Sequence, residues 1–320
     1  MSVSNQIIQN LEKYLNNSHS YMSAYAKRHI LNLDYNNIYL AGNSGTFDKL
    51  TFYKKLKRYL YSIQEFIIFR SIIFENIFIN EYKKLCKIQK RLFNYDLIIH
   101  SIVLDILNKR KLLLNNICTI GDGKANFVSG LLFINKIQNY NIKKKRGGCS
   151  QASLSNDGKN NEYIKKIYSI NLPQSLIQDY LIIKKFNLIE DSRIKVLNNE
   201  EDLTDEKIHL FLVPAENKFL LKNKKINLFV NSFSFQEMPI SETLNYLEII
   251  KSNNSYLYSL NREQKLMYDG TKINYYDFDI SRKSNIIFEE EAKFTRYYYN
   301  LRFPFFHKKK GKVIHTLAKF

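Results

Sequence analysis

The chain has 320 residues, a length that accommodates one or two domains. Apolar residues make up 45% of it and charged residues 25%, which excludes a wholly disordered chain, a collagen-like chain and a disulfide scaffold. Its 49 basic and 30 acidic side chains give a formal charge of +19. Such a surplus favours an anionic partner such as a nucleic acid, a phosphate or a membrane surface. The alternative is a basic background composition, because the lysines are spread along the whole chain.

The sequence has no evident disulfide framework, metal site or targeting segment. The three cysteines lack close pairing, so neither a disulfide framework nor a metal site is expected. The first eight residues do not resemble a signal peptide. Residues 60–79 are rich in Ile and Phe, but Glu65, Arg70 and Glu75 would each cost about 2.5–3.5 kcal/mol at the centre of a bilayer. We therefore expect a buried helix there and no transmembrane segment. The protein is expected to be cytoplasmic, and the question of peripheral contact with a membrane is left open.

The first third of the chain has a helical pattern. Apolar residues recur at four-residue spacing from Ile7, and a break follows at residues 41–46, AGNSGT. Between residues 47 and 109 the apolar positions again fall at helical spacing. We expect several packed helices that form an N-terminal cap region over residues 1–110, followed by a second unit over residues 111–320.

Beyond residue 112, short apolar runs alternate with helical segments, which is typical of βαβ units and a mostly parallel sheet. Strands are expected at residues 116–120, 167–170, 208–213, 226–230 and 255–259. Helices are expected at residues 125–137, 174–185 and 241–251. The polar stretch at 141–161 has almost nothing to bury and is expected to be a mobile surface loop. The predicted fold class is α/β, with a helical N-terminal region.

The segment NICTIGDGKAN at residues 116–126 combines a buried strand, a Gly-rich turn and the start of a helix. Gly121 and Gly123 leave room for a ligand close to the backbone. The helix start beyond them offers free N–H groups and a partial positive charge to a carboxylate or phosphate. We therefore expect Gly121, Asp122 and Gly123 to bind a cofactor.

Polar side chains also follow the other expected strands. Asn171 ends the second strand, where a ribose-binding Asp or Glu often stands, although a turn Asn is the alternative. Two further sets follow the fourth and fifth strands, namely Asn231, Ser232, Gln236 and Glu237, then Asn261 and Arg262. Ligands of open α/β sheets bind at the carboxyl ends of the strands. Two neighbouring polar sets beside a Gly-rich turn therefore predict a shared crevice, with ordinary polar loops as the alternative.

These segments resemble the class I S-adenosylmethionine-dependent methyltransferases, and more narrowly the sugar O-methyltransferase family of bacterial surface-polysaccharide clusters. The similar blocks are IGDG at 120–123, NLPQSL at 171–176, NSFSFQEMP at 231–239 and LNREQK at 260–265. The resemblance covers residues 112–270 and implies a Rossmann-like class I methyltransferase sheet. It also implies S-adenosylmethionine as cofactor, bound by Gly121, Asp122, Gly123, Asn171, Asn231 and Ser232. The family usually has Asp where this chain has Asn171.

The resemblance further implies methyl transfer to a sugar hydroxyl, carried by a saccharide, a nucleotide-sugar or a lipid-linked sugar. Such a site must align the hydroxyl with the methyl group and remove the hydroxyl proton. Glu237 is the first candidate for the catalytic base, although it equally suits the cap of the helix expected near Ser241. Gln236, Asn261 and Arg262 are expected to bind the acceptor, and a solvated loop position is the alternative for Arg262.

Two other classes of function stay open. The net charge favours an RNA methyltransferase, but the Asp/Asn-Pro-Pro-Tyr/Phe turn typical of base-amino methyltransferases is replaced here by Asn231-Ser-Phe-Ser. A non-catalytic RNA-binding protein would use the helical region and the aromatic, lysine-rich tail at 297–310, unless the aromatic residues belong to the core. An NAD-linked dehydrogenase is disfavoured because Asn126 replaces the third glycine of Gly-x-Gly-x-x-Gly.

Overall fold

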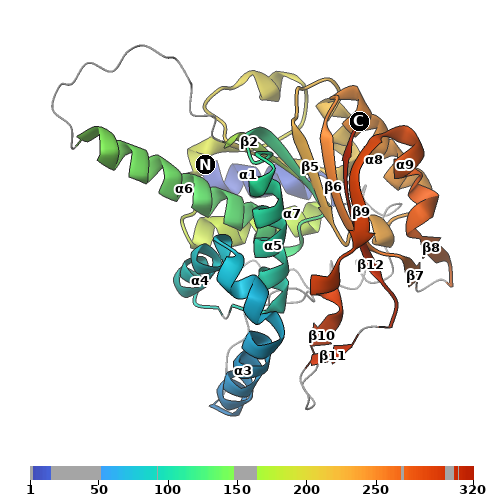
Figure 1. The fold of residues 1–320 in the computed structure, drawn as a ribbon. Helices are drawn as coiled ribbons and strands as arrows, with labels where there is room; N and C mark the ends of the chain where they lie inside the picture. Colours follow the sequence, from blue (N-terminus) through green and yellow to red (C-terminus); the bar gives the residue numbers. More distant parts are fainter. Residues whose placement is uncertain are drawn as a thin grey trace.

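The computed structural model describes residues 3–15, 52–91, 93–147, 164–267, 270–299, 306–308 and 310–320. Its centre is an eight-stranded sheet in the order β3-β4-β2-β1-β5-β6-β12-β9, with helices on both faces (Figure 1). The expected break at residues 41–46 and residues 148–161 of the expected mobile loop lie outside the described residues.

The parallel part of the sheet contains the five expected strands. They are β1 (Asn115–Ile120), β2 (Ile164–Asn171), β4 (Leu210–Pro214), β5 (Leu228–Ser232) and β6 (Tyr256–Arg262). Helices cover both faces of this part, so its strands are buried on both sides and form nearly continuous apolar runs. A short parallel strand that the sequence analysis did not expect, β3 (Ile194–Val196), extends the sheet beyond β4.

Two further unexpected strands complete the sheet, β9 (Asn285–Glu291) and β12 (Val313–Lys319). β12 lies between β6 and β9 and is antiparallel to both. A Rossmann-like sheet of parallel strands, with one antiparallel strand inserted between its last two parallel strands, is the class I methyltransferase arrangement. The predicted fold class is thus confirmed. Two small hairpins lie apart from this sheet, formed by β7 (Gln264–Leu266) with β8 (Lys272–Asn274) and by β10 (Tyr297–Tyr299) with β11 (Phe306–Lys308).

Three helices of the α/β part follow the strands as expected. They are α6 (Asn126–Gly147) after β1, α7 (Pro173–Lys185) after β2 and α8 (Ile240–Ser252) after β5, while the short α9 (Ile280–Lys283) was not expected. α7 begins with Pro173, whose missing N–H is not needed at the first helical position. α6 continues to Gly147 instead of ending at Ile137. Residues 141–147 are therefore helical, and the prediction of a loop there is wrong.

The described N-terminal helices are α1 (Val3–Glu12), α3 (Phe52–Glu75), α4 (Phe78–Ile88) and α5 (Tyr95–Lys109). Ile7 and Leu11 of α1 are buried, in agreement with their four-residue spacing. Buried side chains of α1, α4 and α5 belong to the same hydrophobic cluster as those of α6 and β1. These helices therefore share a core with the sheet, while a domain boundary near residue 110 stays a prediction.

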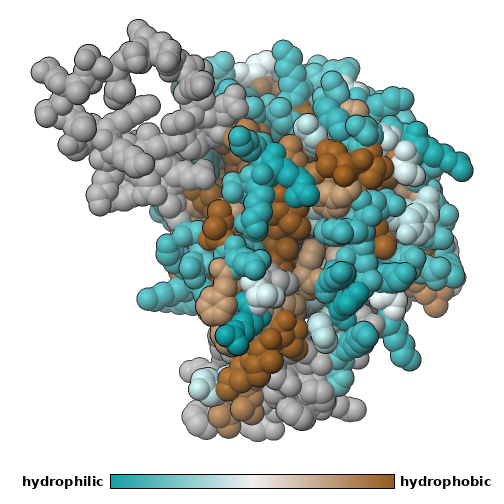
Figure 2. Space-filling view, viewed as in Figure 1, coloured by the Kyte–Doolittle hydropathy of each residue, from teal (hydrophilic) through white to brown (hydrophobic). Residues whose placement is uncertain are grey.

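The prediction of one buried helix at residues 60–79 is wrong in two respects. The helix is interrupted at Asn76, whose side-chain oxygen accepts a hydrogen bond from the N–H of Phe78 at 2.8 Å, where α4 starts. In addition, most large apolar side chains described in α3 are exposed, with Ile67 at 67% and Phe74 at 71%, whereas Phe69 is buried. Figure 2 shows an exposed apolar patch at the lower end of the molecule, where Figure 1 places α3. Within the described ranges, no helix has both the length and the apolar character needed to cross a bilayer.

Candidate functional site

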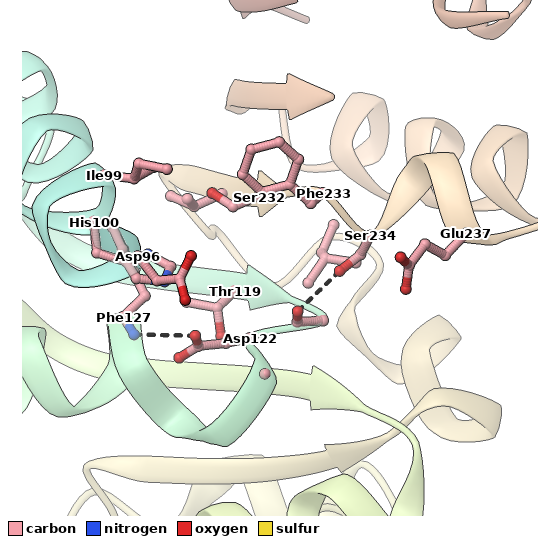
Figure 3. Close-up of a pocket in the computed structure, with 14 residues that line it drawn as sticks. Asp96, Ile99, His100, Thr119, Asp122, Phe127, Ser232, Phe233, Ser234 and Glu237 are labelled. Atoms are coloured by element: carbon pink, nitrogen blue, oxygen red, sulfur yellow. Dashed lines mark hydrogen bonds between the residues drawn. The ribbon is translucent and has the colours of Figure 1, made fainter. Parts of the chain in front are cut away.

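A cavity lies at the carboxyl ends of β1 and β5, which are neighbours in the sheet (Figure 3). The chain runs from β1 outward to β2 and β4 on one side, and then returns to β5 on the other side. This reversal makes the gap between β1 and β5 the topological switch point, where open α/β sheets bind their ligands. The cavity walls come from the ends of both strands, the Gly-rich turn, the start of α6, and helix α5.

The two glycines of the turn have different roles. Gly121 has φ +70°, and a Cβ atom there would lie 2.0 Å from the Oγ of Ser234. That hydroxyl donates a hydrogen bond to the Gly121 carbonyl at 2.8 Å. At Gly123, by contrast, an added Cβ would meet nothing within 4 Å, and the residue lines the cavity. Gly123, rather than Gly121, is therefore the position where the missing side chain leaves room for a ligand.

The Asp122 side chain occupies N–H groups at the start of α6 that were expected to be free for a ligand. Its carboxylate accepts hydrogen bonds from the N–H groups of Phe127 at 3.0 Å and Val128 at 2.7 Å. The prediction that this helix start offers free N–H groups is wrong for these two. Burial raises the pKa of Asp122 to about 6, although the N–H groups and Arg91 act in the opposite direction. Asp122 lines the cavity but also binds the turn to the helix.

The Gly-rich turn between β1 and α6 is conformationally strained. Lys124 has φ +60° and Ala125 has φ +49°, so two adjacent residues with side chains adopt left-handed backbone. Both are buried. Such strain persists only where neighbouring contacts hold it, and it concentrates at ligand sites.

Three predicted site residues form a buried hydrogen-bond network instead of lining the cavity. Asn261 Nδ2 donates to Asn231 Oδ1 at 2.9 Å, and the same oxygen accepts from the N–H of Phe235 at 3.3 Å. Gln236 Oε1 accepts from the N–H of Arg262 at 2.7 Å. The network joins the turn after β5 to β6. Ligand contacts by Asn231, Gln236 and Asn261 stay predictions.

Asn171 and Arg262 also lie outside the residues that line the cavity. The Asn171 side chain donates to the Asp122 carbonyl at 3.3 Å and lies 3.4 Å from Asp179 Oδ2. Its own oxygen accepts from the N–H of Leu172 at 3.0 Å. Arg262 is exposed at the end of β6. The proposed contacts of Asn171 with ribose and of Arg262 with an acceptor stay predictions.

Ser232 and Glu237 do line the cavity, as predicted for a site. Among the described residues, the buried Oγ of Ser232 has no hydrogen-bond partner. The Glu237 side chain is 57% exposed and forms an ion pair of 2.6 Å with Lys265. The alternative role of Glu237 as a helix cap is not found, because Pro239 is the N-cap of α8 and no side chain caps that helix.

Helix α5 contributes a wall of the cavity that was not predicted from the sequence. Asp96 and His100 are four residues apart on this helix, and both face the cavity (Figure 3). Burial, with a smaller effect of Arg91, lowers the pKa of His100 to about 4, so its imidazole is neutral at pH 7. Within the described part of the chain, His100 Nδ1 has no hydrogen-bond partner. The only sequence signal was the Asp-x-x-x-His spacing, which does not by itself connect α5 with the Gly-rich turn.

The charge of the cavity is opposite to that of the chain as a whole. The described residues that line it include Asp96, Asp122 and Glu237 but no Lys or Arg. No group of three or more His, Cys, Asp or Glu suited to hold a metal occurs in the described ranges. The lining therefore offers acidic and hydroxyl groups, with Thr119 and Ser232 supplying hydroxyls.

No family model matches the sequence, and no curated protein matches it significantly. Similar solved structures include an S-adenosylmethionine-dependent methyltransferase from Clostridium acetobutylicum ATCC 824, with 10% identity, covering 75% of this chain and 98% of that chain, at a TM-score of 0.38. The methyltransferase domain of bacterial CtHen1-CN has 7% identity, covering 71% and 100% of the two chains, at a TM-score of 0.39. PigF with SAH has 9% identity, covering 92% and 73%, at a TM-score of 0.28. These values are too low to transfer a function.

Proposed function

We propose that this chain is an S-adenosylmethionine-dependent methyltransferase whose cofactor binds between the ends of β1 and β5. The observation that carries this proposal is that the Gly-rich turn lies at the topological switch point of a class I methyltransferase sheet. Gly123 leaves open space beside the backbone at this point. A ligand can therefore approach the main chain without displacing any side chain.

The residues around Gly123 suit this cofactor. The hydroxyl of Ser232 is available for a hydrogen bond, and Thr119 places a second hydroxyl on the same wall. When bound, S-adenosylmethionine supplies an electrophilic methyl group on a positively charged sulfur. Asp96 also lines the cavity, and its negative charge favours a cationic ligand there, whereas the charge of Glu237 is paired with Lys265.

The acceptor in this proposal is a sugar hydroxyl, in surface-polysaccharide biosynthesis in the cytoplasm. Carboxylates and hydroxyls are suitable hydrogen-bond partners for a sugar, since they accept from its O–H groups. The described lining residues include no Lys or Arg, so the cavity wall itself supplies no countercharge for a phosphate. This favours a free saccharide over RNA, which the net charge of +19 would otherwise favour, but it applies equally to the phosphates of a nucleotide-linked or lipid-linked sugar.

Proton removal has two candidates on opposite sides of the cavity. Transfer joins the acceptor oxygen to the methyl carbon as the carbon–sulfur bond breaks, and the hydroxyl proton passes to a base. Glu237 is the proposed base, because it follows β5 and lines the cavity, although it also forms an ion pair with Lys265. His100 is the second candidate, because its imidazole lines the cavity and is neutral, although the burial that lowers its pKa to about 4 also makes it a weaker base.

Calorimetric titration with S-adenosylmethionine and S-adenosylhomocysteine tests the cofactor directly. Binding of both is expected, and the failure of both to bind would overturn the proposal. Transfer of a radiolabelled methyl group to free, nucleotide-linked and lipid-linked saccharides, with RNA in parallel, tests the acceptor. Methylation of RNA but of no saccharide would replace the sugar with a nucleic acid and leave the cofactor assignment intact.

A further inference from the structure

A buried polar cluster lies behind the Gly-rich turn, between α4 and the first turn of α6. Arg91, which follows α4, donates from Nη1 to Asn126 Oδ1 at 2.6 Å. Asn126 is the first residue of α6 and is fully buried, and Arg91 is 7% exposed. The hydroxyl of Tyr82 on α4 donates to the Asn126 carbonyl at 3.3 Å. Helix α4 and the segment directly after it therefore hold the start of α6 through one side chain each.

The same helix start is held from its other side by Asp122. This carboxylate accepts from two N–H groups of α6, and Arg91 lowers its pKa against the larger effect of burial. A buried guanidinium and a buried carboxylate are each unfavourable unless charge and hydrogen bonds compensate them. Arg91 and Asp122 supply part of that compensation to each other across Asn126. We call Tyr82, Arg91, Asn126 and Asp122 the turn clamp.

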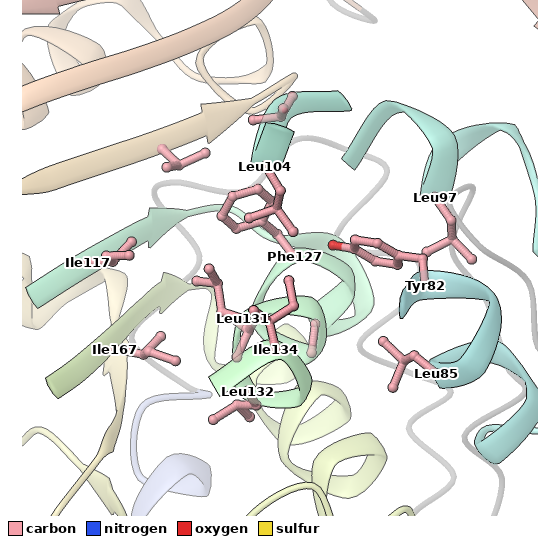
Figure 4. Close-up of a cluster of buried hydrophobic side chains, with 14 of the residues drawn as sticks. Tyr82, Leu85, Leu97, Leu104, Ile117, Phe127, Leu131, Leu132, Ile134 and Ile167 are labelled. Atoms are coloured by element: carbon pink, nitrogen blue, oxygen red, sulfur yellow. The ribbon is translucent and has the colours of Figure 1, made fainter. Parts of the chain in front are cut away.

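Close packing between the two helices keeps the turn clamp in place. A Cβ at Gly130 of α6 would lie 2.2 Å from the Tyr82 hydroxyl oxygen, so α4 approaches at a point where only glycine fits. Figure 4 shows the Tyr82 ring between α4 and α6, with its hydroxyl directed towards the start of α6 near Phe127. Tyr82 is buried and belongs to the main hydrophobic cluster. Helix α4 of the N-terminal region thus packs directly against α6, the helix that follows the turn.

We propose that Arg91 is a positioning residue for the cofactor site. Arg91 couples the docking of α4 to ligand binding at the Gly-rich turn. The turn contains left-handed backbone at Lys124 and Ala125, and it needs outside contacts to keep that shape. Arg91 supplies such a contact through Asn126, directly after Ala125. The inference rests on the proposed function, because the ligand at the turn is S-adenosylmethionine. By linkage, a ligand that favours the ordered turn also favours docked α4.

The test measures the Kd of S-adenosylhomocysteine by calorimetry together with the Tm of each variant. Arg91→Met keeps an unbranched chain of similar length but removes the charged donor. Loss of a hydrogen bond from a charged group is expected to raise Kd by about tenfold or more. Arg91→Lys retains the charge and should give an intermediate Kd. Tyr82→Phe removes the weaker, neutral contact and should raise Kd by roughly twofold to fivefold.

Tyr95→Phe is the matched control. It also removes one buried phenolic hydroxyl, which donates to the Phe294 carbonyl at 2.9 Å, and Tyr95 itself is not among the residues that line the cavity. This control should lower Tm and leave Kd unchanged, because a purely structural loss does not act on the folded site. Hydrogen exchange adds a second measurement, in which S-adenosylhomocysteine should slow exchange in α4 of the parent protein and not in Arg91→Met.

Three results would overturn the inference. A folded Arg91→Met variant with a parental Kd would do so directly. If Arg91→Met does not fold, Arg91→Lys and Tyr82→Phe decide, and Kd values equal to that of Tyr95→Phe would contradict the coupling. Ligand protection confined to the turn, with none in α4, would also contradict it. A parent protein that binds no S-adenosylhomocysteine would instead overturn the proposed function, and this inference with it.

Discussion

The hydroxyl of Ser234 occupies the space in which a side chain on Gly121 would begin. It donates to the Gly121 carbonyl at 2.8 Å, and an added Cβ would lie 2.0 Å from its oxygen. Gly121 also has φ +70°, a conformation that residues with a Cβ adopt reluctantly. Two independent constraints therefore require glycine here, and they join the turn after β1 to the turn after β5.

Replacing Gly121 should therefore affect the fold as well as the ligand. Gly121→Ala is expected to lower the free energy of unfolding by about 1–3 kcal/mol, because left-handed backbone and the clash with Ser234 both oppose the new Cβ. Urea unfolding measures the loss. Gly123→Ala is the matched control and should change stability by less than about 0.5 kcal/mol, since nothing lies within 4 Å of its Cβ.

The double variant Gly121→Ala/Ser234→Gly separates the two causes. Removing the Ser234 side chain relieves the clash but not the backbone strain, so part of the lost stability should return. A double variant no more stable than Gly121→Ala would show that the contact between these two residues does not contribute to the loss.

Gly123 is the better position for a test of ligand binding. Gly123→Leu should leave the free energy of unfolding nearly unchanged, because the new side chain enters open space beside the cavity. The same side chain would occupy space needed by the cofactor, and a rise of about tenfold or more in the Kd of S-adenosylhomocysteine is expected. Calorimetry at several temperatures would detect it. An unchanged Kd would move the cofactor site away from this turn.

The core strands were predictable because a buried parallel strand is a continuous apolar run. Val313–Lys319 and Asn285–Glu291 were missed because they mix apolar residues with His315, Thr316 and a run of glutamates. β9 has only one neighbour in the sheet, and its burial alternates along the strand. Such a pattern does not stand out from the polar segments around it. Within the aromatic tail at 297–310, the structure tests the core reading only at Tyr297, which packs against the core.

The site was only half predictable for a related reason. The Gly-rich turn is local in sequence, so Gly123, Asp122 and Ser232 could be placed near the cavity from motif and strand position alone. His100 and Asp96 reach the same cavity from a preceding helix, and only the packing of α5 brings them there. Polar residues at strand ends were assigned to ligands, whereas Asn231 and Asn261 bind each other. A sequence pattern does not show whether a buried amide faces a ligand or a neighbouring amide.

The pKa of Asp122 predicts a specific pH dependence of stability. The folded pKa is about 6, against an ordinary value of 3.8, so the folded state retains a proton that the unfolded state has lost. The stability contributed by Asp122 therefore falls as pH rises through 3.8 to 6. Relative to Asp122→Asn, the parent protein should lose about 1 kcal/mol of stability between roughly pH 5 and 7.5. Urea unfolding of both proteins at the two pH values measures this difference, and equal pH dependence would contradict it.

The last prediction concerns the base for methyl transfer. Glu237→Gln retains the shape of the side chain but removes its charge, and loss of a general base lowers kcat by about 10²–10⁴-fold. The Kd of S-adenosylhomocysteine should stay nearly the same, because the ion pair of Glu237 with Lys265 lies on the exposed side of the cavity. Lys265→Met is the companion variant, since it breaks that ion pair and keeps the carboxylate. It should change kcat only if Glu237 takes the proton.

His100→Gln separates the second candidate from the first, in an assay with whichever acceptor is methylated. If His100 is the base, kcat falls by about 10²–10⁴-fold in this variant and does not fall in Glu237→Gln. The pH profile does not separate the two candidates, because the pKa of about 4 for His100 lies in the range of an ordinary carboxyl group, so the two variants decide. Full turnover in Glu237→Gln would eliminate Glu237 as the base. Full turnover in both variants would mean that neither side chain removes the proton.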